Sequence, residues 1–189
     1  HLGTYALEPS TFRAARLMET PAGLHGLQAL SALVRLLPER DPHPQVYVAL
    51  TTLVDLFDDP VLAAGLLVRF ELRILDELGF GLDLERCAAT GTNDDLAYVS
   101  PKSGRAVSRS AGDPYRDRML RLPGFLADAP GGRPDVADLI DAFRLTGFFL
   151  SRHVYQPRGL PEPAARERFV ALFSPERRTE TSDAVETGA

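Results

Sequence analysis

Apolar residues recur every three or four positions along the first part of the chain, which is the spacing of one face of an α-helix. The clearest run consists of Leu24, Leu27, Leu30, Leu33, Val34 and Leu37. Thr20 can cap this helix, Pro21 suits its first turn, and Pro38 ends it. We therefore predict a helix that buries one continuous face.

The same spacing continues in segments that also begin near a proline. One ridge consists of Val46, Leu50, Leu53, Val54 and Phe57. The next helix is expected over 60–78, behind a cap at Asp59. Other patterns predict helices over 9–18, 135–157 and 163–173. Short connections between such helices favour an antiparallel bundle.

The segment 82–112 has a different texture, with glycine, serine and threonine between short alternating runs. Residues 96–99 and 105–108 have lengths and patterns that suit small strands. We predict a mainly α fold in which a helical domain over 1–81 and 113–173 carries this segment as a small, ribbon-like β lobe.

The composition allows one sizeable core and little more. The chain has 189 residues, 44% of them apolar, and its single cysteine excludes an internal disulfide framework. No apolar run approaches the roughly 20 residues that cross a bilayer, and the start does not resemble a signal peptide, so we expect a cytoplasmic protein. We also expect a disordered tail over 174–189 and a preceding part before His1.

Charge is spread unevenly along a chain whose net charge is -5. From Asp55 to Asp95, ten acidic residues outnumber three arginines, a balance of -7. From Ser100 to Arg121, six cations outnumber two aspartates, a balance of +4. A locally basic face can bind phosphate even on an acidic protein, and ordinary solvated surface is the alternative explanation.

No motif of an enzyme stands out. The sequence contains no G-x-S-x-G, no H-E-x-x-H and no phosphate-binding glycine loop. We therefore expect no catalytic residue and no cofactor. One rival hypothesis is a small hydrolase or transferase in which Asp94, Asp95 and His153 converge on a pocket.

Two stretches resemble the C-terminal region of RecO, a bacterial family of recombination mediators. The first runs from Arg69-Phe70-Glu71-Leu72 through a glycine stop at 78–81 to Cys87, Thr90 and Gly91, and the second spans 98–108. The resemblance implies a nucleoid-associated DNA repair protein that binds single-stranded DNA, the single-strand binding protein and RecR. It also implies roles in strand annealing and recombinase loading. The N-terminal OB-fold of the family is not expected in this chain.

In many RecO sequences the inserted lobe resembles a zinc ribbon. The resemblance puts Cys87, Thr90, Ser108 and Ala111 at the four ligand positions, so one sulfur ligand remains. A structural zinc site needs four thiolate or imidazole ligands, which hydroxyls do not replace. We therefore predict a lobe that has lost its zinc ligands and holds no metal, with Cys87 buried as a small apolar residue.

Basic residues are the candidates for contacts with phosphate. The predicted DNA-binding set is Lys102, Arg105, Arg109, Arg116, Arg118, Arg121, Arg152 and Arg158. Tyr98 and Tyr115 lie close in sequence to the first six and could stack on bases, although Tyr98 in a strand suits a core equally well.

The resemblance also implies an apolar groove for the acidic, phenylalanine-ended tail of the single-strand binding protein. Arg69 is the candidate for binding the tail carboxylate. An ion pair of Arg69 with Asp55 or Asp59 is the alternative. A further alternative is a helical scaffold that binds proteins and no nucleic acid. The candidates for the groove wall are Leu24, Leu27 and Leu30.

Overall fold

Local capping signals set where the main helices begin. The structure is a computed structural model that describes residues 13–127 and 133–174. Thr20 Oγ1 accepts a hydrogen bond from the Gly23 amide at 3.0 Å, and Asp59 Oδ1 accepts one from the Leu62 amide at 3.1 Å. The helices of the bundle are α1 (Arg13–Met18), α2 (Pro21–Val34), α3 (Pro44–Val54), α4 (Pro60–Glu77), α6 (Gly124–Ala127), α7 (Val136–Leu150), α8 (Gln156–Arg158) and α9 (Ala164–Ala171).

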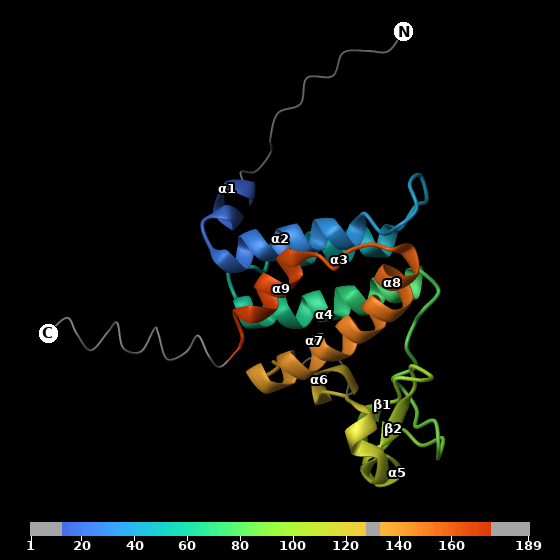
Figure 1. Cartoon of the computed structure of the whole chain (residues 1–189). Helices are drawn as coiled ribbons and strands as arrows, with labels where there is room; N and C mark the ends of the chain where they lie inside the picture. The colour runs from blue at the N-terminus through green and yellow to red at the C-terminus, as the bar shows by residue number, and fades with distance from the viewer. Residues whose placement is uncertain (1–12, 128–132, 175–189) are drawn as a thin grey trace, which may run out of the picture.

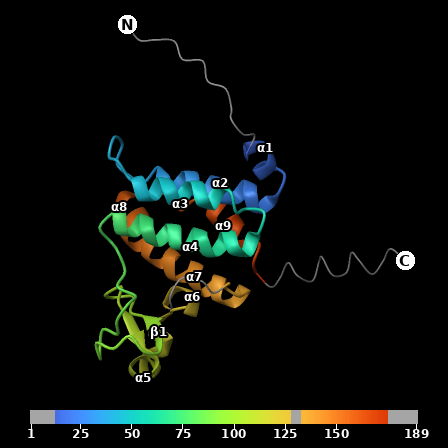
Figure 2. The ribbon, with the colours of Figure 1, turned by 180° about the vertical axis from the view of Figure 1, so that it is seen from behind.

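The helices pack in rows around α4. Helix α4 contacts α2, α3 and α7, and α9 packs against α2. Figure 1 shows α9 between α2 and α4, and Figure 2 shows α3 and α4 from the opposite side. The small sheet lies beyond α7 at one end of the molecule (Figure 1). The predicted mainly α fold with a small β lobe is confirmed.

Helix α4 ends in the glycine stop that the sequence predicts. Gly79 has a φ of 83°, in the left-handed region that glycine adopts without steric cost. The Gly79 amide donates to the Asp76 carbonyl at 2.9 Å, and the Phe80 amide donates to the Leu75 carbonyl at 2.8 Å. This pair of bonds is a Schellman motif, which turns the chain out of the bundle toward the lobe.

A buried ion pair joins the helices α4, α7 and α9. Glu71 of α4 has no exposed surface, and the Arg166 side chain of α9 is 13% exposed. Arg166 Nε and Nη2 donate to the two Glu71 carboxylate oxygens at 2.6 and 3.0 Å, and Nη2 also donates to the Phe143 carbonyl at 2.9 Å. Thr146 of α7 donates its hydroxyl proton to Glu71. Burial would lower the pKa of Arg166, but the Glu71 carboxylate raises it above its ordinary value.

Aromatic rings surround the inner face of α9. Phe169 is fully buried, and its ring meets those of Phe57, Phe143 and Phe173 edge-on at centroid distances of 6.2, 6.1 and 5.5 Å. The apolar spacing that predicts a helix over 163–173 therefore also identifies Phe169 and Phe173, which pack α9 against the core.

The helix predicted over 135–157 changes its geometry before its end. Helix α7 stops at Leu150, and the π-helix η2 (Ser151–Tyr155) connects it to α8. Pro157 lies inside this continuous helical run, because Tyr155 before α8 has a φ of -73° and a ψ of -53°. A proline removes a hydrogen bond within a helix, and η2 in the preceding turn is the local change of geometry that accompanies it. The wider turn of η2 shifts the side chains that follow relative to those of α7.

The lobe is a three-stranded antiparallel sheet in the order β2-β1-β3. Strands β1 (Leu96–Val99) and β2 (Ala106–Ser108) match the predicted strands, whereas β3 (Leu120–Arg121) comes from beyond 112 and was not predicted. Helix α5 (Arg109–Gly112) and the 3-10 helix η1 (Asp113–Arg118) connect β2 to β3.

One face of the sheet belongs to the main core. Val99 and Ala106 are fully buried among the apolar residues of the bundle. Cys87, Tyr98 and Val107 form a separate small cluster inside the lobe. The lobe thus has little core of its own and depends on the bundle for its position.

None of the helices within the described part of the chain is long and apolar enough to cross a membrane.

Replacing Arg166 by Met should lower the free energy of unfolding by about 3 to 5 kcal/mol, because the Glu71 carboxylate stays buried without its partner. Urea unfolding followed by circular dichroism measures this change. The double variant E71L/R166M should lose much less, since it leaves no buried charge. The control R168M, at an exposed position of α9, should change stability by less than about 0.5 kcal/mol. Equal losses in R166M and R168M would contradict the role of the ion pair.

Candidate nucleic-acid and partner interfaces

Six of the predicted DNA-binding residues lie on the lobe, and all six are exposed. Lys102 is in the turn between β1 and β2, and Arg105 directly precedes β2. The others follow β2 in chain order, on α5, η1 and β3, and are Arg109, Arg116, Arg118 and Arg121. A stretch of sequence with a balance of +4 therefore corresponds to one structural unit.

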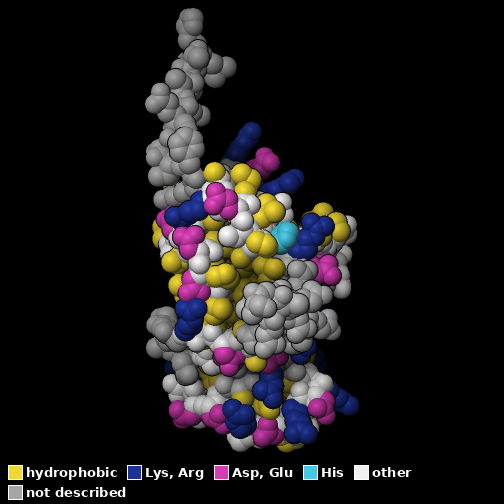
Figure 3. All heavy atoms as spheres, turned by 90° about the vertical axis from the view of Figure 1, so that its left-hand side faces the viewer, with side chains coloured by type: hydrophobic (Ala, Val, Ile, Leu, Met, Phe, Trp, Pro, Cys, Tyr) yellow, Lys and Arg dark blue, Asp and Glu magenta, His cyan; other side chains and the backbone are white. Residues whose placement is uncertain are grey.

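Three of these cations have a nearby carboxylate. Arg105 Nε lies 3.1 Å from Asp83 Oδ2, and Arg109 Nε lies 3.2 Å from Asp95 Oδ1. Arg116 pairs with its neighbour Asp117 at 3.8 Å. Basic and acidic side chains accordingly alternate over the lower end of the molecule in Figure 3. Such exposed pairs contribute little to stability, so these arginines can exchange carboxylate for phosphate at small cost.

The remaining three of the six predicted lobe residues are Lys102, Arg118 and Arg121. Within 13–127 and 133–174, the structure shows no carboxylate within 4 Å of their charged groups. Tyr115, in η1 beside Arg116, is 59% exposed. Tyr98 is buried and donates its hydroxyl proton to Asp113 at 2.6 Å, so its ring belongs to the lobe core. Of the two tyrosines, Tyr115 is therefore the one whose ring a base can reach.

The last two predicted DNA-binding residues lie on the bundle. Arg152 of η2 donates to the Pro101 carbonyl at 3.1 Å, which brings it beside the turn that carries Lys102. Arg158 of α8 donates to the Leu36 carbonyl at 3.1 Å, next to the end of α2. The structure thus adds Arg152 to the lobe cations and leaves Arg158 on the bundle.

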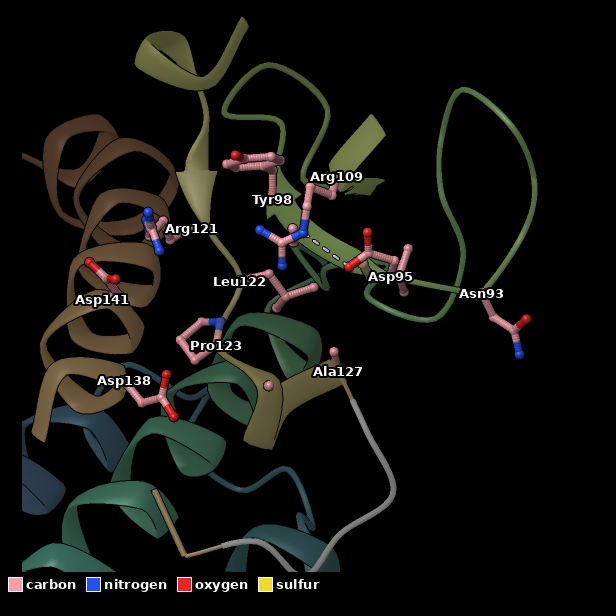
Figure 4. Close-up of a pocket in the computed structure, with 13 residues that line it drawn as sticks. Asn93, Asp95, Tyr98, Arg109, Arg121, Leu122, Pro123, Ala127, Asp138 and Asp141 are labelled. Carbon is pink, nitrogen blue, oxygen red and sulfur yellow. Dashed lines mark hydrogen bonds and ion pairs between the residues drawn. The ribbon is translucent and has the colours of Figure 1, made fainter. Parts of the chain in front are cut away.

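A cavity of about 350 Å³ lies at the junction of the lobe and α7. Arg109 and Arg121 line it from the lobe, and Asp138 and Asp141 line it from α7 (Figure 4). Burial and the nearby Asp135 carboxylate raise the pKa of Asp138 above its ordinary value. The walls of the cavity therefore carry opposite charges, which favours contact between the lobe and the bundle over capture of an anion.

A smaller pocket of about 290 Å³ lies between α3 and α4. Leu53, Leu66 and Phe70 contribute apolar surface, and Arg69 and Arg73 line one side. The Arg69 guanidinium donates to the Phe125 carbonyl and lies 5.8 Å from the centroid of the Phe125 ring. An apolar pocket with two guanidinium groups suits an apolar ligand that ends in a carboxylate.

Arg73 is a pocket residue that the sequence reasoning missed. Its Nη2 lies 2.7 Å from Glu77 Oε1, but its buried Nε has no hydrogen-bond acceptor within the described residues. The signal was present, because Arg73 lies four positions after Arg69 and therefore on the same face of α4.

The three leucines predicted as a groove wall do not line this pocket. Leu30 is fully buried in the core, and Leu24 and Leu27 are half-buried on α2. Asp59, one of the alternative partners of Arg69, binds the Arg133 guanidinium at 2.6 and 3.0 Å. The wall beside Arg69 comes from α3.

The knuckle at Cys87 is held by hydrogen bonds. The Ser108 amide donates to Cys87 Sγ at 3.2 Å, and the Ser108 hydroxyl lies 3.4 Å from it. The Cys87 amide donates to the Thr92 carbonyl at 2.7 Å, and the Gly91 amide donates to the Cys87 carbonyl at 2.8 Å. Burial raises the pKa of the thiol, but hydrogen bonds from Ser108 and Thr90 outweigh it and bring the pKa to about 6.

The residues at the knuckle do not fit zinc. One thiol stands among hydroxyl groups, and Thr90 Oγ1 lies 2.9 Å from Thr92 Oγ1 in a hydrogen bond of its own. The described parts of the chain gather no group of three or more histidine, cysteine or acidic residues that could hold a metal. A single sulfur donor is insufficient for a tetrahedral site.

The residues of the rival hydrolase hypothesis have separate surroundings. Asp95 pairs with Arg109 in the lobe and lines the junction cavity, which His153 does not line. His153 is stacked between Phe80 and Phe149, at centroid distances of 5.0 and 5.9 Å. Its ring therefore has a packing role at the base of the lobe.

Comparison with known proteins gives consistent results. The family described as recombination protein O, C-terminal, matches residues 18–161. DNA repair protein RecO of Rhizobium etli is 60% identical over 170 residues, which cover 90% of this chain and 66% of that protein. The RecO proteins of Agrobacterium fabrum and Mesorhizobium japonicum are 57% and 54% identical, over 95% and 100% of this chain and 72% and 75% of theirs. The chain spans about two thirds of the length of the first of these relatives. No solved structure matches it.

Replacing Ser108 by Ala should raise the pKa of the Cys87 thiol from about 6 toward its ordinary value, because one donor to the sulfur is lost. Thiolate absorbance against pH measures the change, and the single cysteine makes the signal unambiguous. The lowered pKa means that the ionised Cys87 thiolate is favoured in the folded state. Its contribution to the free energy of unfolding should therefore be present at alkaline pH and be lost as the pH falls through about 6. The control S103A, at an exposed serine in the turn between β1 and β2, should leave the titration unchanged. A midpoint above 8 in the unmodified protein would contradict this account.

Proposed function

This chain belongs to the RecO family, and from that premise we propose that it is a DNA repair and recombination mediator. In this role it binds single-stranded DNA, the tail of the single-strand binding protein and RecR, and thereby promotes strand annealing and recombinase loading. Each of these tasks needs surfaces that bind other macromolecules and no covalent chemistry, so we propose that it is not an enzyme.

The observation that carries the proposal is the cationic surface of the lobe. Lys102, Arg118 and Arg121 are exposed and have no carboxylate partner among the described residues, and Arg152 joins them through Pro101. Phosphate contacts supply most of the sequence-independent affinity for nucleic acid. Tyr115 adds an exposed ring on which a base can stack.

The paired arginines of the lobe have a second role in the proposal. Arg105, Arg109 and Arg116 are bound to aspartates at the surface when DNA is absent. Their release to phosphate adds contacts as a strand settles on the lobe. Their weak pairs also limit non-specific attraction, which suits a protein that is acidic overall.

The pocket between α3 and α4 is the proposed site for the tail of the single-strand binding protein. Its apolar floor suits a terminal phenylalanine, and Arg69 with Arg73 suits the terminal carboxylate. Arg73 is held by Asp76 at 3.2 Å and by Glu77 at 2.7 Å, so Arg69 is the principal candidate for the carboxylate. RecR remains a proposed partner without an assigned surface.

Replacing Lys102, Arg118 and Arg121 together by Gln should weaken binding to a labelled oligothymidylate. The slope of log K against log salt concentration should become shallower by about 2, since each lost phosphate contact removes about 0.7. Fluorescence anisotropy at several salt concentrations measures both quantities.

The control for this test removes the exposed cations Arg16, Arg35 and Arg168 from the bundle. Equal effects of the two triple variants would contradict the lobe as the DNA surface. No binding at low salt by the unmodified chain would favour the helical scaffold that binds proteins alone.

The variant R69M keeps an apolar stem over Phe125 and removes the guanidinium. It should weaken binding of an acidic peptide that ends in phenylalanine by about 2 kcal/mol, roughly thirtyfold. Amidation of the peptide should weaken binding to the unmodified protein by a similar factor. R69M should then bind the free acid and the amide equally. A full additional loss on amidation would show that Arg69 does not hold the carboxylate.

A further inference from the structure

A stripe of basic and aromatic side chains runs along the outer face of α7 and continues into η2. Arg144, Phe148 and Arg152 follow one another at four-residue intervals and line one groove of about 690 Å³. Leu120 of β3 forms its edge on the lobe side. From Arg144 to Arg152 the helix advances by about 12 Å, a length suited to a short stretch of an extended chain.

The centre of the groove is an aromatic surface next to a guanidinium. The Arg152 guanidinium lies 5.8 Å from the centroid of the Phe148 ring, and its Nη1 donates to the Pro101 carbonyl. The edge of the ring meets Phe149 at a centroid distance of 5.2 Å. Phe148 is half-buried, so packing holds its ring in place while part of it faces the groove.

The cations of this groove differ in their availability. The Arg144 side chain is 70% exposed, and its distance to Asp141 is 3.7 Å, so that pair contributes little. Arg166 also lines the groove but is held by Glu71. Glu162 is the carboxylate among the lining residues. An anion entering the groove would therefore meet Arg144 first.

We propose that this groove binds a nucleotide of single-stranded nucleic acid, with the base against Phe148 and Arg152 and a phosphate on Arg144. The inference rests on the proposed function, and it extends the DNA path from the lobe to the bundle. The path is continuous, because Arg152 contacts Pro101 and Lys102 is the next residue. Stacking on aromatic and guanidinium planes tolerates any base, as a mediator of annealing requires.

Three substitutions test the groove by anisotropy of a labelled oligothymidylate with the 189-residue chain. F148L keeps apolar bulk and removes the ring, so affinity should fall at least fivefold with an unchanged salt slope. R144Q should reduce the affinity and make the slope shallower by about 0.7. E162Q should raise the affinity several-fold, because it removes a repulsive charge. R168Q, an equal charge change on the exposed face of α9, should have no effect.

An oligomer of abasic sites separates stacking from charge. The unmodified chain should bind it at least fivefold more weakly than oligothymidylate, and this ratio should be clearly smaller in F148L, in which Tyr115 is the exposed lobe ring that remains. Unchanged affinity in both F148L and R144Q, with the lobe variant still impaired, would overturn the groove and leave the proposed function standing. Absence of oligonucleotide binding by the unmodified chain would overturn both. Loss of acidic-peptide binding in R144Q with DNA binding intact would show a protein site instead.

Discussion

The buried pair of Glu71 and Arg166 is the interaction on which the rest of the structure depends. A carboxylate without exposed surface is tolerated only because a guanidinium and the Thr146 hydroxyl satisfy it. The pair joins α4 to α7 and α9 at one point. The rings around Phe169 pack α9 against the same part of the core. Helix α9 lies beyond the 18–161 segment that matches the family, yet it completes the core of the bundle. The surfaces proposed for binding are built on this closed bundle.

The surroundings of an arginine distinguish the one that holds the bundle together from those proposed to bind DNA. Arg166 is inside the bundle, where a broken pair leaves an uncompensated charge, whereas the pairs of Arg105 and Arg109 lie in water and are weak. Arg152 is intermediate, since it contacts the lobe through Pro101 and keeps its guanidinium beside Phe148. The same residue type thus holds a helix in the core in one place and lies at the surface, where it is proposed to contact phosphate, in another.

Most helices and strands could be predicted from local signals in the sequence. Contacts between residues far apart in the chain could not. Caps at Thr20 and Asp59 act within three residues, so they were predictable from neighbours alone. Strand β3 has two residues and forms only because β1 offers a free edge, so no pattern marked it. The burial of Glu71 depends on a partner 95 positions away. The lobe cations were predicted as a set, but their aspartate partners required the fold.

Native-state hydrogen exchange is the most direct test of the central claim. The claim is that the Glu71–Arg166 pair holds α4, α7 and α9 together as one unit, and that the lobe is less stable than this unit. The account predicts that the slowest amides of α4, α7 and α9 exchange with a single opening free energy, equal to that of global unfolding. Amides of β1 and β2 should open at a distinctly lower free energy, because the buried cluster that the lobe has apart from the main core is small, consisting of Cys87, Tyr98 and Val107. Exchange of α9 well before α4, or a lobe as protected as the bundle, would contradict it.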